Sequence, residues 1–74
     1  MSYRYKGRTE RGREVVETDL VACLESLCFI ANKDPNRAWL KADSFEPSSW
    51  HVYESKEAGS DADGGFAIIS KELP

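Results

Sequence analysis

The sequence has few of the residues that build reactive or cross-linked sites. Its 74 residues include one histidine, His51, and two cysteines, Cys23 and Cys28. On a helix these cysteines would lie about 140° apart around the axis, so they cannot form a disulfide with each other. Zinc would need four ligands, and the two thiols and His51 offer no chelating pair at the usual spacing. We therefore expect two core thiols in a reducing compartment, with no metal site and no cofactor.

The sequence also lacks long hydrophobic runs. No stretch of about 18 apolar residues is present, and the first residues do not resemble the apolar segment of a signal peptide. We expect a soluble, cytoplasmic protein that does not bind membranes.

Signatures of catalysis are missing as well. There is no glycine-rich phosphate loop, and a domain of this size has little room for a pocket that excludes water. A cysteine nucleophile would have to be exposed beside His51, whereas both cysteines fall within a predicted buried surface. Asp61 and Asp63 precede two glycines as in a calcium loop, but the third ligand position and the distal glutamate are missing. We expect no enzyme and no calcium site.

The one long apolar stretch, residues 18–32, predicts the main helix. At 100° per residue its apolar arc spans roughly 180°, wider than the ~100° stripe of an ordinary surface helix. We expect Thr18 to cap the N-terminus and Asn32 to end the helix in the left-handed conformation. Such a wide arc requires a sheet to bury it.

The strands are predicted on both sides of this helix. Residues 50–70 contain two β-rich segments, WHVYES and FAIIS, separated by a polar, glycine-rich loop that would close a hairpin. Residues 35–43 permit a short helix, which propensity slightly favours, or a turn followed by a strand. The whole chain, residues 1–74, is predicted to be one α+β domain, with one main amphipathic helix packed on an antiparallel sheet of three or four strands and a short second helix if 35–43 is helical.

Charge divides the chain unequally. Residues 1–13 carry five basic side chains and one acidic one, whereas the remaining residues carry five basic and twelve acidic ones. Tyrosines alternate with the cations in YRYK, which fits an edge strand with tyrosines inward and cations outward, although a frayed arm is the alternative. Cations can bind acidic groups or phosphates, and tyrosine can stack on unpaired bases. The candidate partner-binding residues of this segment are Tyr3, Arg4, Tyr5, Lys6, Arg8, Arg11 and Arg13.

One further candidate lies on the helix. Phe29 would project about 180° from the leucine stripe, so either the following loop covers its ring or the ring anchors a partner.

These patterns favour a small, non-catalytic protein-binding module that acts as an inhibitor or adaptor of a larger protein or complex. Viruses and mobile elements encode many proteins of this kind, and the basic segment suggests an acidic protein partner. One alternative is a nucleic-acid-binding accessory protein that uses the basic, tyrosine-containing N-terminus. Another is a structural subunit of an assembly, and a homodimer would relieve the shortage of core in so small a chain.

Overall fold

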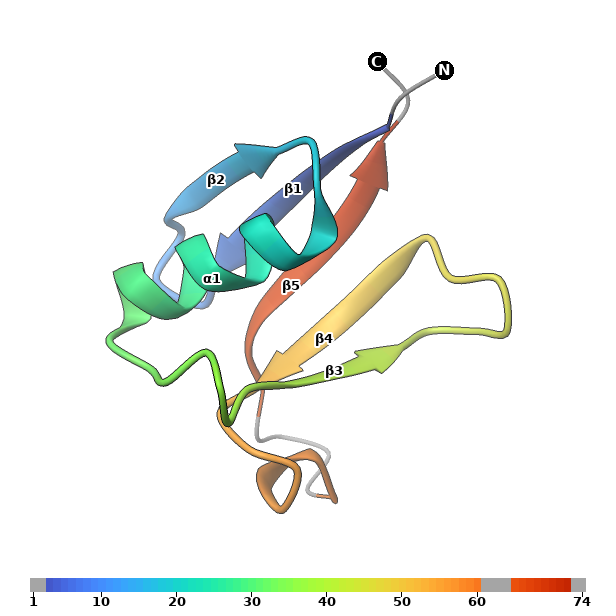
Figure 1. Cartoon of the computed structure of the whole chain (residues 1–74). Coiled ribbons are helices and arrows are strands. Elements are labelled where there is room, and N and C mark those ends of the chain that lie inside the picture. Colours follow the sequence, from blue (N-terminus) through green and yellow to red (C-terminus); the bar gives the residue numbers. More distant parts are fainter. Residues whose placement is uncertain (1–2, 61–64, 73–74) are drawn as a thin grey trace.

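Five strands form one antiparallel sheet, and one α-helix packs on it. The computed structural model describes residues 3–60 and 65–72 (Figure 1). In chain order the elements are β1 (Arg4–Thr9), β2 (Glu14–Glu17), α1 (Leu20–Ala31), β3 (Trp39–Ala42), β4 (Ser49–Tyr53), the short 3₁₀ helix η1 (Ala58–Ser60) and β5 (Gly65–Glu72). The strands lie in the order β2-β1-β5-β4-β3. The α+β class is as predicted, but the sheet has five strands rather than three or four.

Both ends of α1 are fixed by local hydrogen bonds. Asp19 caps the N-terminus, because its extended backbone lets the carboxylate accept a hydrogen bond from the amide of Ala22 at 3.2 Å. The cap predicted at Thr18 is therefore wrong by one residue. Asn32 ends the helix in the left-handed conformation, as predicted, and the amides of Asn32 and Lys33 donate to the carbonyls of Phe29 and Cys28. Within the described residues, no helix has the length and hydropathy needed to span a membrane.

The predicted short second helix is a turn followed by a strand. Asp34 organises the turn: its side chain accepts a hydrogen bond from the amide of Asn36, and its carbonyl accepts from the amides of Arg37 and Ala38. The chain then pairs with β4 as strand β3, which half-buries Leu40. Pairing and burial outweigh the slight helical preference of this segment, and the second alternative, a turn followed by a strand, supplies β3 as the fifth strand.

The N-terminal segment is part of the sheet. Strand β1 pairs with both β2 and β5, so it is an interior strand and the prediction of an edge strand is wrong. The turn after β1 is closed by Thr9, whose amide donates to the carbonyl of Arg13 and whose hydroxyl accepts from the Arg13 amide. Gly12 has a φ of 85°, a conformation that glycine adopts without a side-chain penalty.

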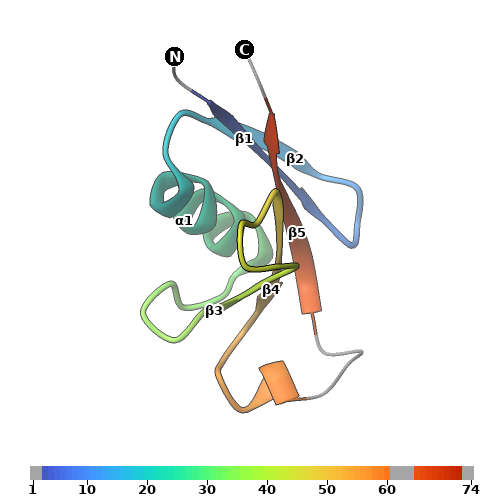
Figure 2. The same ribbon diagram turned by 90° about the vertical axis from the view of Figure 1, so that its right-hand side faces the viewer.

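Helix α1 covers only one face of the sheet, over β1, β2 and β5 (Figure 2). Its buried side chains pack against those of β4 and β5: the core consists of Cys23, Leu27, Cys28, Val52, Phe66, Ala67 and Ile69. The helix approaches β1 closely at Gly7, where a Cβ atom would lie 2.6 Å from Cδ1 of Leu27. Among the described elements, only η1 lies against the opposite face, which we call the outer face, and it does so at one end of the sheet, beside Trp39 and Tyr53.

Candidate protein-binding face

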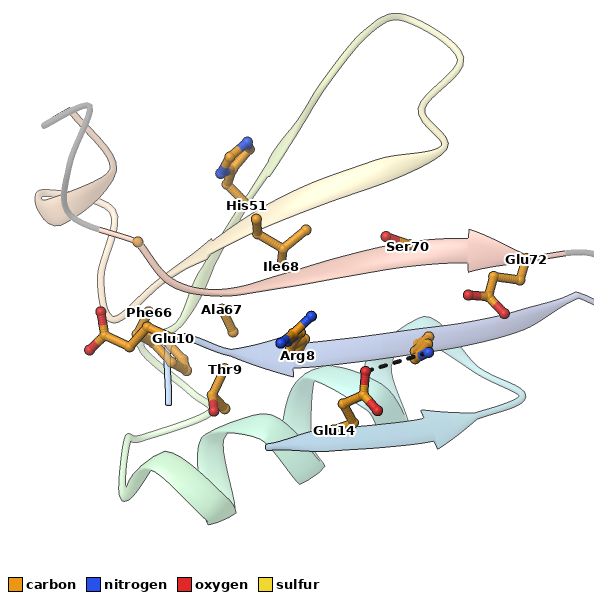
Figure 3. Close-up of a pocket in the computed structure, with 12 residues that line it drawn as sticks. Arg8, Thr9, Glu10, Glu14, His51, Phe66, Ala67, Ile68, Ser70 and Glu72 are labelled. Atoms are coloured by element: carbon orange, nitrogen blue, oxygen red, sulfur yellow. Dashed lines mark ion pairs between the residues drawn. The ribbon is translucent and has the colours of Figure 1, made fainter. Parts of the chain in front are cut away.

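Strand alternation places one set of cations on the outer face. The Cβ position of Gly7 points at α1, so the neighbouring residues of β1 point the other way. Register extends this assignment to the other strands, and Figure 3 shows several of these side chains on the side of the sheet away from α1. The outer face comprises Arg4, Lys6, Arg8, Glu14, Val16, Lys41, Ser49, His51, Ile68, Ser70 and Glu72, and, at the end where η1 packs, Trp39 and Tyr53.

One row of residues crosses the whole outer face. From β2 to β3, register aligns Glu14, Arg8, Ile68, His51 and Lys41. Cβ atoms of directly opposed residues lie about 4.5–5.5 Å apart, so neighbouring side chains in the row are close enough to interact. The row therefore places an apolar group at its centre with basic groups on both sides.

The centre of this row is exposed although it lies on a central strand. Ile68 is 46% exposed, whereas the next residue, Ile69, is fully buried against α1. Val16 on edge strand β2 adds a second exposed apolar side chain, 55% exposed. A small apolar surface surrounded by polar and charged groups is the usual composition of a protein-binding surface.

The cations of the outer face are mostly unpaired. Lys6 lies 3.4 Å from Glu14, and both side chains are more than 40% exposed, so this ion pair contributes only ~0–1 kcal/mol. Within residues 3–60 and 65–72, Arg4 and Arg8 form no ion pair. Arg4 lies opposite Glu72 in the register, whereas Arg8 lies opposite Glu14 and Ile68. Arg8 is thus the cation next to the exposed isoleucine.

The same face contains an open hollow of about 490 Å³. Figure 3 shows Arg8, Glu14, His51 and Ile68 around it, and Lys6 also lines it. Its lining combines apolar and basic side chains with three acidic ones, Glu10, Glu14 and Glu72. The hollow is open, which suits the side chains of a docked protein surface better than a small molecule that must be surrounded.

The structure separates the residues that the sequence grouped as one basic site. Arg4, Lys6 and Arg8 come together on the outer face, but Tyr5 points to the inner face and packs against Trp50, with ring centroids 5.8 Å apart. Tyr3 is 40% exposed, and Lys71 Nζ lies 4.1 Å from its ring centroid.

The other two arginines of the basic N-terminal segment, Arg11 and Arg13, lie in or next to the β1–β2 turn. They line a second hollow together with residues at the C-terminal end of α1, away from the row through Ile68. Phe29 projects from α1 and is 87% exposed, so the following loop does not cover it. These three side chains are therefore not part of the outer face.

Sequence reasoning missed several exposed side chains. The alternation in FAIIS could have placed Ile68 and Ile69 on opposite faces, but it could not say which one α1 would cover. Phe45, in the connector between β3 and β4, is 99% exposed, and no local pattern distinguishes it from a core phenylalanine.

The buried thiols are poor nucleophiles in this fold. Burial, together with the charge of Glu17, raises the pKa of Cys23 to about 11, and the Cys23 thiol donates a hydrogen bond to the carbonyl of Tyr5 at 3.6 Å. Burial, with Asp34 and Glu25, also raises the pKa of Cys28. His51 lies on the outer face, so the sheet separates its imidazole from both thiols.

No group of three or more histidine, cysteine, aspartate or glutamate side chains gathers within the described part of the chain. The aspartates weighed as calcium ligands, Asp61 and Asp63, lie outside it.

Comparison of the chain with models of known protein families, with curated proteins and with solved structures gives no match.

Proposed function

We propose that the chain is a non-catalytic protein-binding module that uses the outer face of its sheet to bind an acidic surface on a partner protein. By occupying that surface it acts as an inhibitor or adaptor. One observation carries the proposal: the row in which Ile68, 46% exposed, lies between Arg8 and His51 on the outer face.

The chemistry of the row suits a partner with carboxylates around an apolar spot. Ile68 supplies the apolar contact, and burying its exposed part on binding contributes on the order of 1 kcal/mol. Arg8 can bind a carboxylate through two parallel hydrogen bonds, which fixes orientation as well as adding energy. Arg4 and Lys6 extend the positive charge along β1 and would speed association with an acidic surface.

The area of the outer face can be compared with that of a standard protein–protein interface. Five strands spaced about 4.8 Å apart, each contributing about five residues of 3.3 Å, make a projected area of roughly 400 Å². A standard interface buries about 800 Å² of accessible surface on each partner. The outer face alone is therefore smaller than one side of a standard interface, and contacts from the β1–β2 turn, which carries Arg11, would enlarge it.

The cations could equally bind phosphates, so nucleic acid is the competing ligand. Stacking of bases on Tyr5, which would support that alternative, is opposed by the inward packing of this ring against Trp50. A strong dependence of affinity on salt would mark nucleic-acid binding through counterion release.

The test compares a charge reversal on the face with the same reversal elsewhere. Arg8→Glu changes the centre of the row, and Arg37→Glu makes the same change in the exposed turn between α1 and β3. The proposal is supported if a protein from the source cells binds the wild-type chain and Arg37→Glu but not Arg8→Glu, and if the same pattern is reproduced with purified components. Identical partners for all three chains would refute it.

A parallel titration with a single-stranded 20-nucleotide DNA at about 50 mM salt tests the competing ligand. Tight binding of this DNA that Arg8→Glu abolishes would replace the protein partner by nucleic acid.

A further inference from the structure

The loop that joins β3 to β4 (Figure 1) carries a phenylalanine that is almost completely exposed. Phe45 is 99% exposed, whereas Phe66 is 7% exposed and belongs to the core. The ring of Phe45 therefore adds almost nothing to the packing of this domain. An aromatic ring that is kept in water on such a loop is available to bury its surface against another molecule.

The loop that carries this ring is held by hydrogen bonds to one carboxylate. Asp43 accepts hydrogen bonds from the amide of Ser48 at 3.3 Å and from the hydroxyls of Ser49 and Ser44 at 3.2 and 3.4 Å. The Asp43 amide donates to the carbonyl of Ser49 at 3.1 Å, and the Ser44 hydroxyl donates to the carbonyl of Glu46 at 3.1 Å.

Two further constraints fix the loop against the sheet. The amide of Lys71 in β5 donates to the carbonyl of Ser48 at 2.8 Å. Pro47 restricts the backbone of Glu46 to extended conformations. The backbone around Phe45 is thus ordered before any partner arrives, which lowers the entropy lost on binding.

The loop that carries the ring is acidic, and the cation beside it is Lys71 of β5, which lines a hollow together with Glu46, Pro47 and Ser48. Although partial desolvation acts in the opposite direction, hydrogen bonds from Ser49, Ser48 and Ser44 lower the pKa of Asp43 below its ordinary value, so this carboxylate is ionised at neutral pH. Glu46 follows Phe45 directly, and residues 42–50 contain no lysine or arginine. A surface that receives this ring would gain from basic side chains around it.

We propose that Phe45 is an anchor that enters an apolar pocket on a partner protein, and that basic side chains surround the mouth of that pocket. Aromatic side chains, phenylalanine among them, are enriched at the cores of protein interfaces, and an ordered backbone lowers the entropy lost when one of them is buried. The anchor does not depend on the row through Ile68, because the ring and its acidic neighbours belong to the β3–β4 loop, which is held by hydrogen bonds within the loop and with Ser49 and Lys71.

Two other occupants fit the loop less well. An anionic membrane would attract the ring, but Asp43 and Glu46 would repel its headgroups. The outer face of a second copy offers positive charge and Ile68. However, a contact between the β3–β4 loop of one copy and the outer face of the next joins two different surfaces, so it would build open chains of copies rather than a closed dimer.

The experiment replaces Phe45 with the photoreactive aromatic residue p-benzoylphenylalanine and irradiates the full chain in extract from the source cells. The matched control carries the same residue in place of Val21, an exposed apolar position on α1. Excess unlabelled wild-type chain and excess Phe45→Ala chain serve as competitors. The cross-linked protein is then purified, and its dissociation constants are measured for wild type, Phe45→Ala and Val21→Ala.

The proposal expects a saturable cross-link at position 45 that the wild-type chain suppresses and Phe45→Ala does not. With the purified partner, Phe45→Ala should weaken binding at least about 30-fold, as loss of a central aromatic anchor does, and Val21→Ala less than about 2-fold. Glu46→Lys should also weaken binding, with an effect that shrinks as salt is raised. Retention of the cross-link in an Arg8→Glu background shows that the loop binds by itself, so failure of the outer-face proposal would leave this one standing.

Four outcomes would overturn the anchor. They are the absence of a saturable cross-link, equal competition by Phe45→Ala, cross-linking only between copies of this chain, and co-flotation with vesicles of phosphatidylcholine and phosphatidylserine (70:30) that depends on Phe45.

Discussion

Replacing Gly7 with alanine should destabilise the domain through the contact between α1 and β1. The new Cβ atom would lie 2.6 Å from Cδ1 and 2.9 Å from Cγ of Leu27, and 3.0 Å from Sγ of Cys23. All three atoms belong to fully buried side chains, so none can move into solvent to make room. Inserting a methyl group into a packed core of this kind costs about 1–3 kcal/mol.

That cost is large for a chain of 74 residues, whose free energy of unfolding is expected to be roughly 4–11 kcal/mol. A domain of this size loses about 4–8 °C in Tm for each kcal/mol, so Gly7→Ala should lower Tm by roughly 5–20 °C. Thermal unfolding followed by far-UV circular dichroism measures Tm, and urea titration gives the free energy of unfolding with its slope.

Gly12→Ala provides the control. Gly12 has a positive φ of 85°, but a Cβ atom added there would have no neighbour within 4 Å, so alanine costs about 1–2 kcal/mol of backbone strain alone. Shortening Leu27 to valine should relieve part of the Gly7→Ala cost and none of the Gly12→Ala cost, which a double-mutant cycle resolves. A neutral Gly7→Ala, or a cost that is simply additive with Leu27→Val, would show that α1 does not pack on β1 as described.

Three other predictions follow from burial and titration. Phe66→Ala should cost about 3–5 kcal/mol of stability, whereas Phe45→Ala should leave the urea midpoint unchanged; equal losses would contradict the exposure of Phe45. The pKa of Cys23 is raised in the folded state, so the thiol of the unfolded chain releases its proton at a lower pH than the folded thiol does. The free energy of unfolding should therefore fall as the pH rises from about 9 to about 11, and it should fall less in Cys23→Ala. Urea titrations across this pH range measure it, and a stability that does not change with pH would contradict the prediction. The pKa of Asp43 is lowered, so its carboxylate orders the β3–β4 loop at neutral pH and loses this effect when acid protonates it. Hydrogen exchange at the Ser48 amide, corrected for its intrinsic pH dependence, should therefore be faster in acid and faster in Asp43→Asn. Unchanged protection of this amide would refute the role of the carboxylate.

The sequence predicted what depends on neighbouring residues. Asn32 ends α1 because its short polar side chain tolerates the left-handed conformation, and the alternation in YRYK correctly separates Tyr5 from the adjacent cations. The sequence left segment 35–43 open between helix and strand, because its weak helical preference is overruled by pairing with β4, a contact that no local pattern contains.

The composition of the outer face also depends on contacts distant in sequence. Ile68 becomes the centre of the row only because β5 lies between β1 and β4, which brings residues 8 and 51 to either side of it. Alternation can divide a strand into two faces, but the order of the strands and the face chosen by the helix are set by the packing of the whole chain. The exposure of Phe45 likewise follows from the loop geometry that Asp43 imposes.

The binding role of the outer face is tested most directly by the affinity of the purified partner for Arg8→Glu and Arg37→Glu, measured by isothermal titration calorimetry at the same salt concentration. Reversal of the charge beside Ile68 should weaken binding at least about 10-fold, equivalent to about 1.4 kcal/mol, because it replaces an attraction to the partner's carboxylates with a repulsion. The same reversal at Arg37 should change the affinity less than about 2-fold. Equal affinities for the two variants would contradict the assignment of the outer face as the binding surface.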